Sequence, residues 1–152
     1  MFLGVSTLNL DVKGRIAIPA KHRAALSACC DARVVVTVHP QEHCLWLYPE
    51  DEWLVIANKL LKLPAMIRQN QLLQRLLLGH ASELEMDGQG RILLSPELRA
   101  YAGLGKKVSL VGQGNKFEIW DEATWSGNRE AWLAEANDSG SQLSEQLSEM
   151  VF

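Results

Sequence analysis

The stretch that decides the fold is Asp11-Val-Lys-Gly-Arg-Ile, because it returns 76 residues later as Asp87-Gly-Gln-Gly-Arg-Ile. A fainter match, at an offset of 72, relates residues 44–50 to residues 116–122. A chain that repeats itself in this way is built from two similar units. Each unit repeats an arginine directly after a glycine turn, and arginine is the side chain best suited to phosphate and to guanine edges.

Both units are expected to run through strand, turn, strand, short helix, hairpin and a further helix. The strands are indicated by alternating or β-branched runs, and they are expected at 5–10, 15–18, 33–38, 44–48, 107–111 and 116–120. Turns are expected at 11–14 and 112–115. The short helix of the first copy is expected at 20–28. That of the second copy should open at Ser95-Pro96, a cap followed by proline, and end near Gly103.

A helical connection is predicted between the copies. Residues 51–62 carry apolar side chains at the spacing of an amphipathic helix, Pro64 interrupts it, and a second helix at 66–78 ends at Gly79. A further helix is expected to begin near Asp121. The last segment, 137–152, is acidic and is expected to be loosely ordered, with a short helix from Leu143. The predicted domains are therefore 1–52, 53–80, 81–124 and 125–152, and the fold class is a β-rich α+β protein.

Bulk composition indicates a soluble globular chain. Its 152 residues are 47% hydrophobic and 22% charged, with a net charge of −3. No apolar run is long enough to span a membrane, and the N-terminus lacks the features of a secretory signal. Cys29 and Cys30 are adjacent, which is poor geometry for a disulfide, so we expect unpaired cysteines in a reducing cytoplasm.

The charge is unevenly distributed along the chain. Residues 1–40 contain five Lys or Arg against two acids, whereas residues 129–152 contain one base against five acids. The local field, not the net charge, decides where a polyanion binds. The N-terminal part therefore favours nucleic acid as a partner.

Two roles are open for the repeated Asp and Arg. An Asp–Arg pair can simply stabilise a turn. Both copies, however, keep glycine before the arginine and place other bases nearby, which favours a DNA-binding surface. We expect Arg15 and Arg91 on that surface, with phosphate contacts from further bases and a structural role for the turn residues. The further bases are Lys13, Lys21, Arg23 and Arg99, and the turn residues are Asp11, Gly14, Asp87 and Gly90.

Several longer stretches resemble the MraZ family of bacterial transcription regulators. They are Met1-Phe-Leu-Gly, Asn9-Leu-Asp-Val-Lys-Gly-Arg-Ile-Ala-Ile-Pro, Arg75-Leu-Leu-Leu-Gly-His-Ala-Ser-Glu, Met86-Asp-Gly-Gln-Gly-Arg and Val111-Gly-Gln-Gly-Asn-Lys-Phe-Glu-Ile-Trp-Asp-Glu. The resemblance is expected to fade beyond about Trp125. It places the family's Asp-x-x-x-Arg motif on Asp11/Arg15 and Asp87/Arg91.

The resemblance implies both a fold and a function. The fold would be a duplicated swapped-hairpin β-barrel of the AbrB/SpoVT type, with chains assembled into a ring. The function would be binding to short G-rich direct repeats in the promoter of the division and cell-wall gene cluster, usually as a repressor. The partners are then double-stranded DNA and further copies of the chain, with no membrane, and the location is cytoplasmic and nucleoid-associated. The serine that opens the short helix of copy two has no counterpart in copy one, where Pro19 stands, so we expect the copies to contribute unequally.

Other residues that could carry chemistry are weaker candidates. His39, His43 and Cys44 could suggest zinc, but no fourth ligand is evident, so no metal is expected there. Cys29 and Cys30 are interpreted as small apolar residues at a helix end. No nucleophile, base and oxyanion site come together, so neither an enzyme nor a cofactor is expected. The alternatives are an antitoxin-like DNA-binding barrel, whose acidic tail would neutralise a toxin, and an oligomeric protein scaffold.

Overall fold

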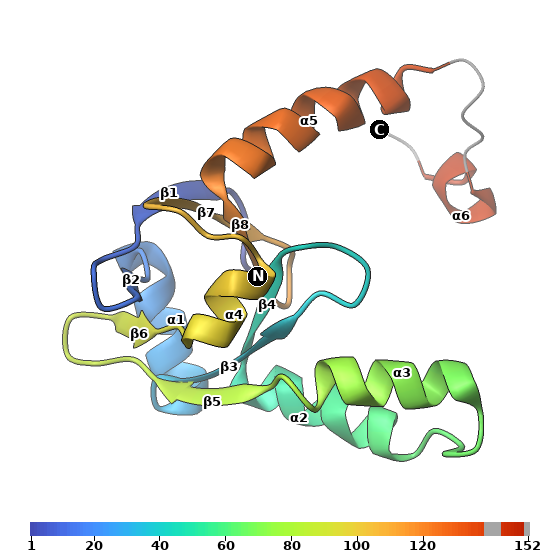
Figure 1. The fold of residues 1–152 in the computed structure, drawn as a ribbon, viewed down its shortest axis with the longest axis horizontal. Coiled ribbons are helices and arrows are strands. Elements are labelled where there is room, and N and C mark those ends of the chain that lie inside the picture. Colours follow the sequence, from blue (N-terminus) through green and yellow to red (C-terminus); the bar gives the residue numbers. More distant parts are fainter. Residues whose placement is uncertain (139–143, 151–152) are drawn as a thin grey trace. The chain divides into compact units, whose positions relative to one another are not determined.

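The computed structural model describes residues 1–138 and 144–150 and divides the chain into two compact units, Met1–Glu122 and Ala123–Phe152. The fold is mixed α+β, with antiparallel sheets (Figure 1). Its strands are β1 (Val5–Asn9), β2 (Arg15–Ala17), β3 (Arg33–Val38), β4 (Leu45–Pro49), β5 (Ser82–Glu85), β6 (Arg91–Leu93), β7 (Lys107–Gly112) and β8 (Phe117–Asp121). Its helices are α1 (Ala20–Cys30), α2 (Glu50–Leu61), α3 (Arg68–Leu77), α4 (Pro96–Tyr101), α5 (Glu122–Ala136) and α6 (Glu145–Ser148).

The two repeats exchange strands. Six strands form one sheet in the order β1-β7-β8-β4-β3-β5, and β2 pairs with β6 in a separate ribbon. The first strand of each repeat is therefore bonded to the third strand of the other, β1 to β7 and β5 to β3. Counted inward from either edge, the strands are the first, third and fourth strands of a repeat. Among the described strands, β1 and β5 remain edges of this sheet, so hydrogen bonding does not close it into a barrel.

Two hydrophobic cores lie on the two sides of β3. Val34, Val36 and Val38 belong to the main core, together with the isoleucines of the β2–β6 ribbon. Val35 points to the other side and packs into a smaller core. That smaller core is completed by Tyr48, Trp53, Leu60 and Leu77, which come from β4, α2 and α3. Because β3 is buried on both faces, residues 33–38 form an almost continuous apolar run.

The predicted difference between the two helix starts is confirmed. The Oγ of Ser95 accepts a hydrogen bond from the Leu98 N–H at 3.2 Å at the start of α4. Pro19, at the start of α1, offers no side-chain cap. The connecting helices are also found, with α3 beginning at Arg68 and not at 66. Figure 1 shows α2 and α3 side by side.

The cysteines do not behave as expected. We expected Cys29 and Cys30 to stay unpaired, and the structure joins them in a disulfide. The two residues are the last of α1, which runs two residues past its predicted end, and adjacency does not prevent their pairing here. The chain then leaves the helix through Asp31 and Ala32, both with positive φ.

The C-terminal segment contains a short helix, as predicted. The short helix expected from Leu143 is present as α6, while 139–143 and 151–152 of the predicted loose tail lie outside the described residues. Among the helices that the structure describes, none is long and apolar enough to cross a bilayer.

The ribbon provides a test of the fold. Ile16 and Ile92 face each other across it and are each 1% exposed, whereas Leu93 on the opposite face is 53% exposed. Ile16→Ala should lower the free energy of unfolding by ~2–5 kcal/mol, because it removes buried methyl groups and leaves a cavity. Leu93→Ala, the control on the outer face, should change it by no more than ~0.5 kcal/mol. Urea unfolding measures both, and similar losses for the two variants would contradict the assignment of inner and outer faces.

Candidate nucleic-acid interface

The first turn is closed by a single carboxylate. Asp11 Oδ1 accepts hydrogen bonds from the backbone N–H groups of Lys13 at 2.9 Å and Arg15 at 2.8 Å. Asp11 Oδ2 accepts a third bond from the Nε of Arg15 at 2.8 Å. The backbone adds the bonds Gly14 N to Asp11 O and Asp11 N to Arg15 O, both 3.0 Å. One side chain thus shapes the turn and fixes the direction of the arginine that follows it.

The second turn repeats this geometry. Asp87 Oδ1 accepts from the N–H groups of Gln89 and Arg91, each at 2.9 Å, and Oδ2 accepts from Arg91 Nε at 2.8 Å. The sequence pattern that predicted a shared structural motif therefore corresponds to the same set of bonds in both copies. In each case Nε is the only guanidinium atom that donates to the carboxylate, and no acceptor within the described residues takes up the Nη atoms.

Both arginines lie on one face of the ribbon. In the antiparallel pairing of β2 with β6, Arg15 is opposite Leu93, Ile16 is opposite Ile92, and Ala17 is opposite Arg91. Side chains alternate between faces along a strand, so the face opposite the buried isoleucines carries both arginines at diagonal corners. Their side chains are 29% and 32% exposed. The ribbon thus presents two guanidinium groups outward, each held by its own carboxylate.

The turns are braced crosswise between the repeats. The guanidinium of Arg99, from copy two, lies against Gly14, where a Cβ would be 2.8 Å from Arg99 Cζ. Arg23, from copy one, lies closer still to Gly90. Both glycines have positive φ, +89° and +74°, a conformation that L side chains rarely adopt. A side chain at either glycine would therefore strain the backbone and displace the other repeat's arginine.

Arg23 and Arg99 are also tied to their own repeats. Arg23 Nε donates to the carbonyl of Ile18, and Arg99 Nε donates to the carbonyl of Leu94 at 3.1 Å. Ile18 and Leu94 in turn bond to the turn of the other repeat. Ile18 N donates to Gly90 O at 2.8 Å, and Leu94 N donates to Gly14 O at 2.9 Å. This bracing could not be read from the sequence, because it depends on which repeat's turn lies beside which helix.

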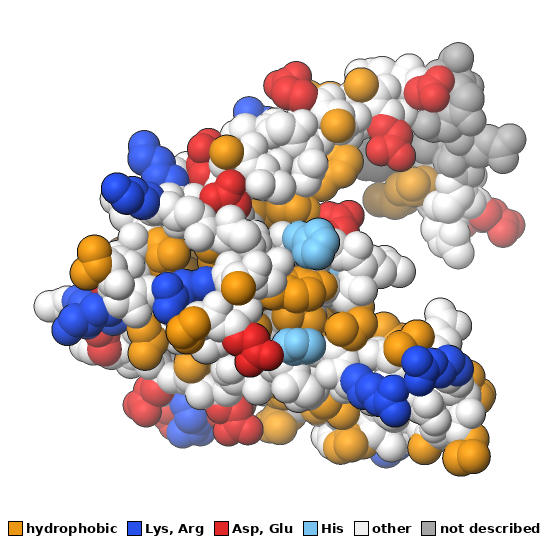
Figure 2. All heavy atoms as spheres, viewed as in Figure 1, with side chains coloured by type: hydrophobic (Ala, Val, Ile, Leu, Met, Phe, Trp, Pro, Cys, Tyr) orange, Lys and Arg blue, Asp and Glu red, His pale blue; other side chains and the backbone are white. Residues whose placement is uncertain are grey.

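The predicted lysines fall in two places. Lys13 is exposed on the first turn and lines a groove of about 400 Å³ with Arg99 and Ser95. Lys21 lies on α1 near Gly4 and the pocket around Phe2, away from the outer face of the ribbon. Lys and Arg side chains gather at the side of the first unit that carries the β2 and β6 turns (Figures 1 and 2). The structure therefore places Lys13 in one groove with Arg99, whereas Lys21 lines a different pocket.

The carboxylates of the turns are held in the charged form. Hydrogen bonding from the Arg15 backbone N–H is the main cause that lowers the pKa of Asp11 below its ordinary value of 3.8. Desolvation opposes it, and the hydrogen bonds from the Arg15 side chain and the Lys13 N–H lower the pKa further. The pKa of Asp87 is lowered in the same way, first by the Arg91 backbone N–H. Both aspartates therefore stay ionised to a lower pH than an unperturbed aspartate does.

The histidines and Cys44 of the sequence pattern do not converge. His39 stacks on Trp46 and lies 3.8 Å from a Glu118 carboxylate oxygen, and the Nδ1 of His43 lies 3.3 Å from the Tyr101 carbonyl. Cys44 is buried in the core. Within the described residues, the group that does bring potential metal ligands together is Cys29, Cys30 and Asp51. Sequence reasoning missed it, because Asp51 follows 21 residues after Cys30.

Comparison with known proteins gives a consistent result. The family model of the MraZ protein, described as antitoxin-like, matches twice, over residues 1–76 and 77–147. The chain belongs to the MraZ family. Two separate matches to one model agree with the duplication seen in the sequence. The MraZ match also extends to residue 147, so the expectation that the resemblance fades near Trp125 is wrong. The stretches that carry the resemblance all end by Glu122.

Relatives named "Transcriptional regulator MraZ" are similar over most of the chain. That of Thioalkalivibrio sulfidiphilus is 55% identical over 139 residues, which are 91% of this chain and 92% of the relative. That of Nitrosococcus oceani is 56% identical over 125 residues, 82% and 84% of the two chains. That of Halorhodospira halophila is 49% identical over 151 residues and covers 99% of both chains.

The lowered aspartate pKa values predict how stability depends on pH. Because the native pKa values of Asp11 and Asp87 lie below those of the unfolded chain, the unfolded state binds more protons in acid. Their contribution to stability is therefore complete above the ordinary value of 3.8 and is lost as the pH falls through the lowered native values. We expect the wild type to be more stable than the double variant Asp11→Asn/Asp87→Asn at about pH 6, with the difference shrinking from about pH 4 downward. Thermal melting across this range tests it, and a difference that stays constant with pH would contradict the assignment.

Proposed function

We propose that this protein is a sequence-specific DNA-binding transcription regulator that contacts duplex DNA with the outer face of the β2–β6 ribbon. One observation carries the proposal: Arg15 and Arg91 stand on the same outward face, each oriented through Nε by an aspartate. An arginine held in this way keeps its Nη donors for a ligand. The names of the relatives, which call those proteins transcriptional regulators, support the same class of function.

The dimensions of the ribbon suit the major groove. A two-stranded β-ribbon fits into a groove that is ~12 Å wide. Arg15 and Arg91 are separated by two residues along the strands and one strand spacing across, which places their Cα atoms roughly 8 Å apart. This span corresponds to about two to three base-pair steps of duplex DNA. Two arginines at that spacing can each bind the O6 and N7 of a guanine.

The proposed target and assembly follow the MraZ resemblance. The target is a set of short G-rich direct repeats in the promoter of the division and cell-wall gene cluster, and the expected outcome is repression. Several chains would form a ring, in which adjacent subunits bind adjacent repeats and gain affinity through effective concentration. The exchange of strands between the repeats supports an AbrB-like swapped-hairpin fold in each chain. The protein would act in the cytoplasm at the nucleoid, without catalysis or cofactor.

The remaining predicted bases would serve the backbone of the DNA. Lys13 lies on the turn that leads into Arg15 and lines a groove with Arg99, so it is the best placed of these residues to contact a phosphate. Such a contact would set the register of the protein on the duplex. Lys21 stands further away and would reach only a phosphate beyond the ribbon. Arg23 and Arg99 use Nε inside the protein, so their proposed contribution is to hold the turns while their remaining donors meet phosphate.

A second function is suggested by the description of the family as antitoxin-like. Such a protein would bind DNA with the same ribbon and neutralise a toxin with its acidic C-terminal segment. Removing residues 137–152 separates the two cases. If the protein is a regulator only, the truncated chain keeps its operator binding and no toxin binding is lost. If it is an antitoxin, the truncated chain no longer binds its toxin.

The arginines give the decisive test of DNA binding. Arg15→Ala and Arg91→Ala should each weaken binding to the protein's own upstream region by roughly 5- to 150-fold, since a bidentate arginine–guanine contact contributes ~1–3 kcal/mol. Fluorescence anisotropy at fixed salt measures this. Arg33→Ala is the matched control, because Arg33 also bonds a carboxylate through Nε, Glu50 at 3.0 Å, but lies on β3 outside the ribbon.

The same variants separate DNA binding from a purely structural or scaffolding role. Unfolding temperature and oligomer size should stay close to those of the wild type in the double variant Arg15→Ala/Arg91→Ala. If the oligomer dissociates, the arginines belong to a subunit contact and the protein is a scaffold. Equal affinity loss in Arg33→Ala would also contradict the proposal, because it would show a general effect of charge.

A further inference from the structure

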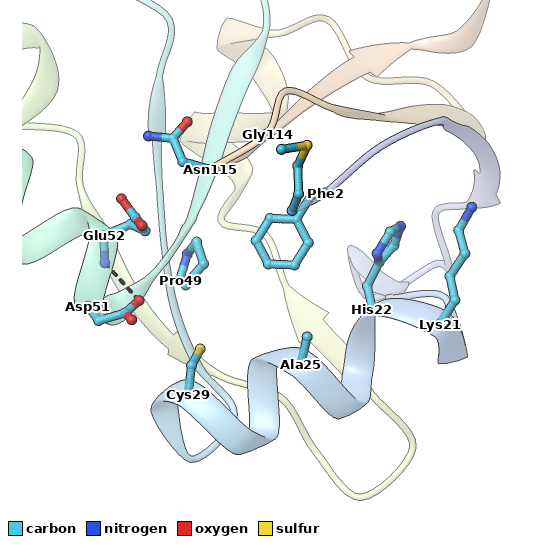
Figure 3. A pocket seen from close by; sticks show the side chains of 11 residues that line it. Phe2, Lys21, His22, Ala25, Cys29, Pro49, Asp51, Glu52, Gly114 and Asn115 are labelled. Carbon is cyan, nitrogen blue, oxygen red and sulfur yellow. Dashed lines mark hydrogen bonds between the residues drawn. The ribbon is translucent and has the colours of Figure 1, made fainter.

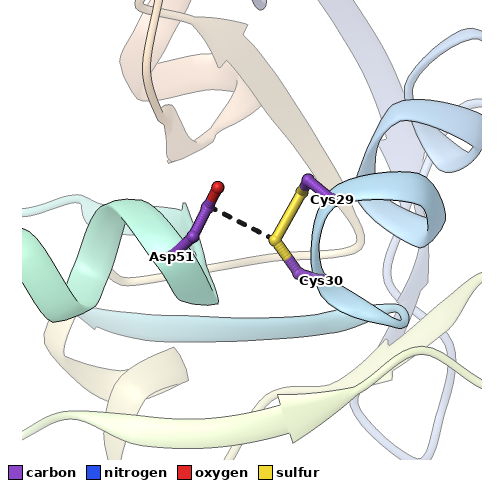
Figure 4. A group of neighbouring side chains, drawn as sticks. All are labelled: Cys29, Cys30 and Asp51. Carbon is purple, nitrogen blue, oxygen red and sulfur yellow. Dashed lines mark hydrogen bonds between the residues drawn. A yellow bond between two sulfur atoms is a disulfide. The ribbon is translucent and has the colours of Figure 1, made fainter.

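Two cysteines and a carboxylate meet where the end of α1 lies against the start of α2. The sulfurs of Cys29 and Cys30 and an oxygen of Asp51 all lie within 4.8 Å of one another. The Sγ of Cys30 is 3.3 Å from Asp51 Oδ1 (Figure 4). Cys30 is buried, whereas Cys29 and Asp51 are exposed. None of these residues belongs to the ribbon, so the cluster is separate from the proposed DNA-binding face.

We propose that, once the disulfide is reduced, Cys29, Cys30 and Asp51 bind a thiophilic divalent ion, Zn²⁺. Zinc accepts thiolate and carboxylate ligands together in a tetrahedral arrangement. With Zn–S near 2.3 Å and Zn–O near 2.0 Å, a sulfur and an oxygen on one ion lie roughly 3.5 Å apart. The separation of Cys30 Sγ and Asp51 Oδ1 is close to this value. Three protein ligands leave the fourth position to water.

The surroundings have room for that water. A pocket of about 250 Å³ opens beside the cluster, and Cys29, Asp51, Glu52 and Asn115 are among the residues that line it (Figure 3). The backbone N–H of Glu52 donates to Asp51 Oδ1 at 2.8 Å and fixes the carboxylate. An ion bound here would be covered on the side of Cys30 and open on the side of the pocket.

The local field also favours a cation. The carbonyl groups at the end of a helix carry a partial negative charge, and α1 has no basic side chain in its last turn. Two thiolates and one carboxylate add three negative charges to this position. A divalent ion offsets most of these charges. We therefore expect the reduced cluster to bind the metal with both cysteines as thiolates.

The chemistry balances in two steps. A dithiol or phosphine reductant first transfers two electrons to the Cys29–Cys30 sulfur–sulfur bond, and two protons convert the sulfurs into thiols. Zn²⁺ then displaces both protons and forms two Zn–S bonds and one Zn–O bond. The oxidised chain lacks both thiolates and should not bind the ion.

Cobalt provides a direct readout of sulfur ligation. The full-length protein, reduced with a phosphine, is titrated with Co²⁺, and thiolate-to-cobalt absorption is recorded before Zn²⁺ is added as competitor. We expect one Co²⁺ per chain with thiolate absorption, its displacement by Zn²⁺, and a higher melting temperature with Zn²⁺, because a ligand that binds only the native state stabilises it. The oxidised protein should show neither absorption nor the shift.

Matched variants assign the ligands. Cys29→Ser and Cys30→Ser should each abolish the thiolate absorption of a two-sulfur site. Asp51→Asn should weaken Zn²⁺ binding by at least ~10-fold, because the loss of a residue that only supports a ligand already costs that much. Asp51 is exposed, so this variant should fold even if Cys30→Ser does not. Cys44→Ala and Glu52→Gln are controls, since Cys44 is buried in the core and Glu52 lines the same pocket. Both should bind as the wild type does.

Three results would overturn the proposal. They are the absence of thiolate absorption in the reduced wild type, its persistence in Cys29→Ser/Cys30→Ser, and unchanged Zn²⁺ affinity in Asp51→Asn. DNA binding by the ribbon variants does not enter this test, so failure here would leave the proposed regulator intact.

Discussion

The pairing of β2 with β6 is the contact on which the rest of the structure depends. Each repeat supplies one strand of three residues, too short to be stable alone, and the ribbon buries Ile16 against Ile92. The exchange continues in the large sheet, where β1 and β5 add to strands of the other repeat. Backbone bonds from Ile18 to Gly90 and from Leu94 to Gly14 then attach each turn to the opposite half. Neither repeat could satisfy these groups without the other.

This constraint explains why two weak ion pairs have a defined role. Partly exposed Asp–Arg pairs contribute little to stability, so Asp11 and Asp87 matter chiefly for direction. Each carboxylate fixes a turn and an arginine together, and the other repeat's Arg99 or Arg23 covers the turn glycine. A side chain ordered before binding loses less conformational entropy when it meets its ligand. The fold thus supplies two pre-oriented guanidinium groups on one face.

Local features of this fold could be predicted from the sequence, whereas contacts between distant residues could not. Ser95-Pro96 opens α4 and Pro64 separates α2 from α3, because caps and proline act on their immediate neighbours. Strand order could not be predicted from the residues themselves, since alternation does not say which strands pair. The cross-bracing by Arg23 and Arg99, and the meeting of Cys30 with Asp51, depend on that order. The Cys29–Cys30 disulfide was missed because adjacent cysteines are poorly placed for the usual disulfide geometry.

The central claim is that Arg15 and Arg91 bind guanine edges as a pair. The most direct measurement replaces guanines in the bound DNA by 7-deazaguanine, which removes the N7 acceptor, and compares affinities of the wild type and Arg15→Ala/Arg91→Ala. If the arginines bind N7, the wild type loses affinity at particular guanines, and the double variant, having already lost the contact, loses no more at those positions. Equal losses for both proteins at every guanine would show that other residues read the bases, and would contradict the account.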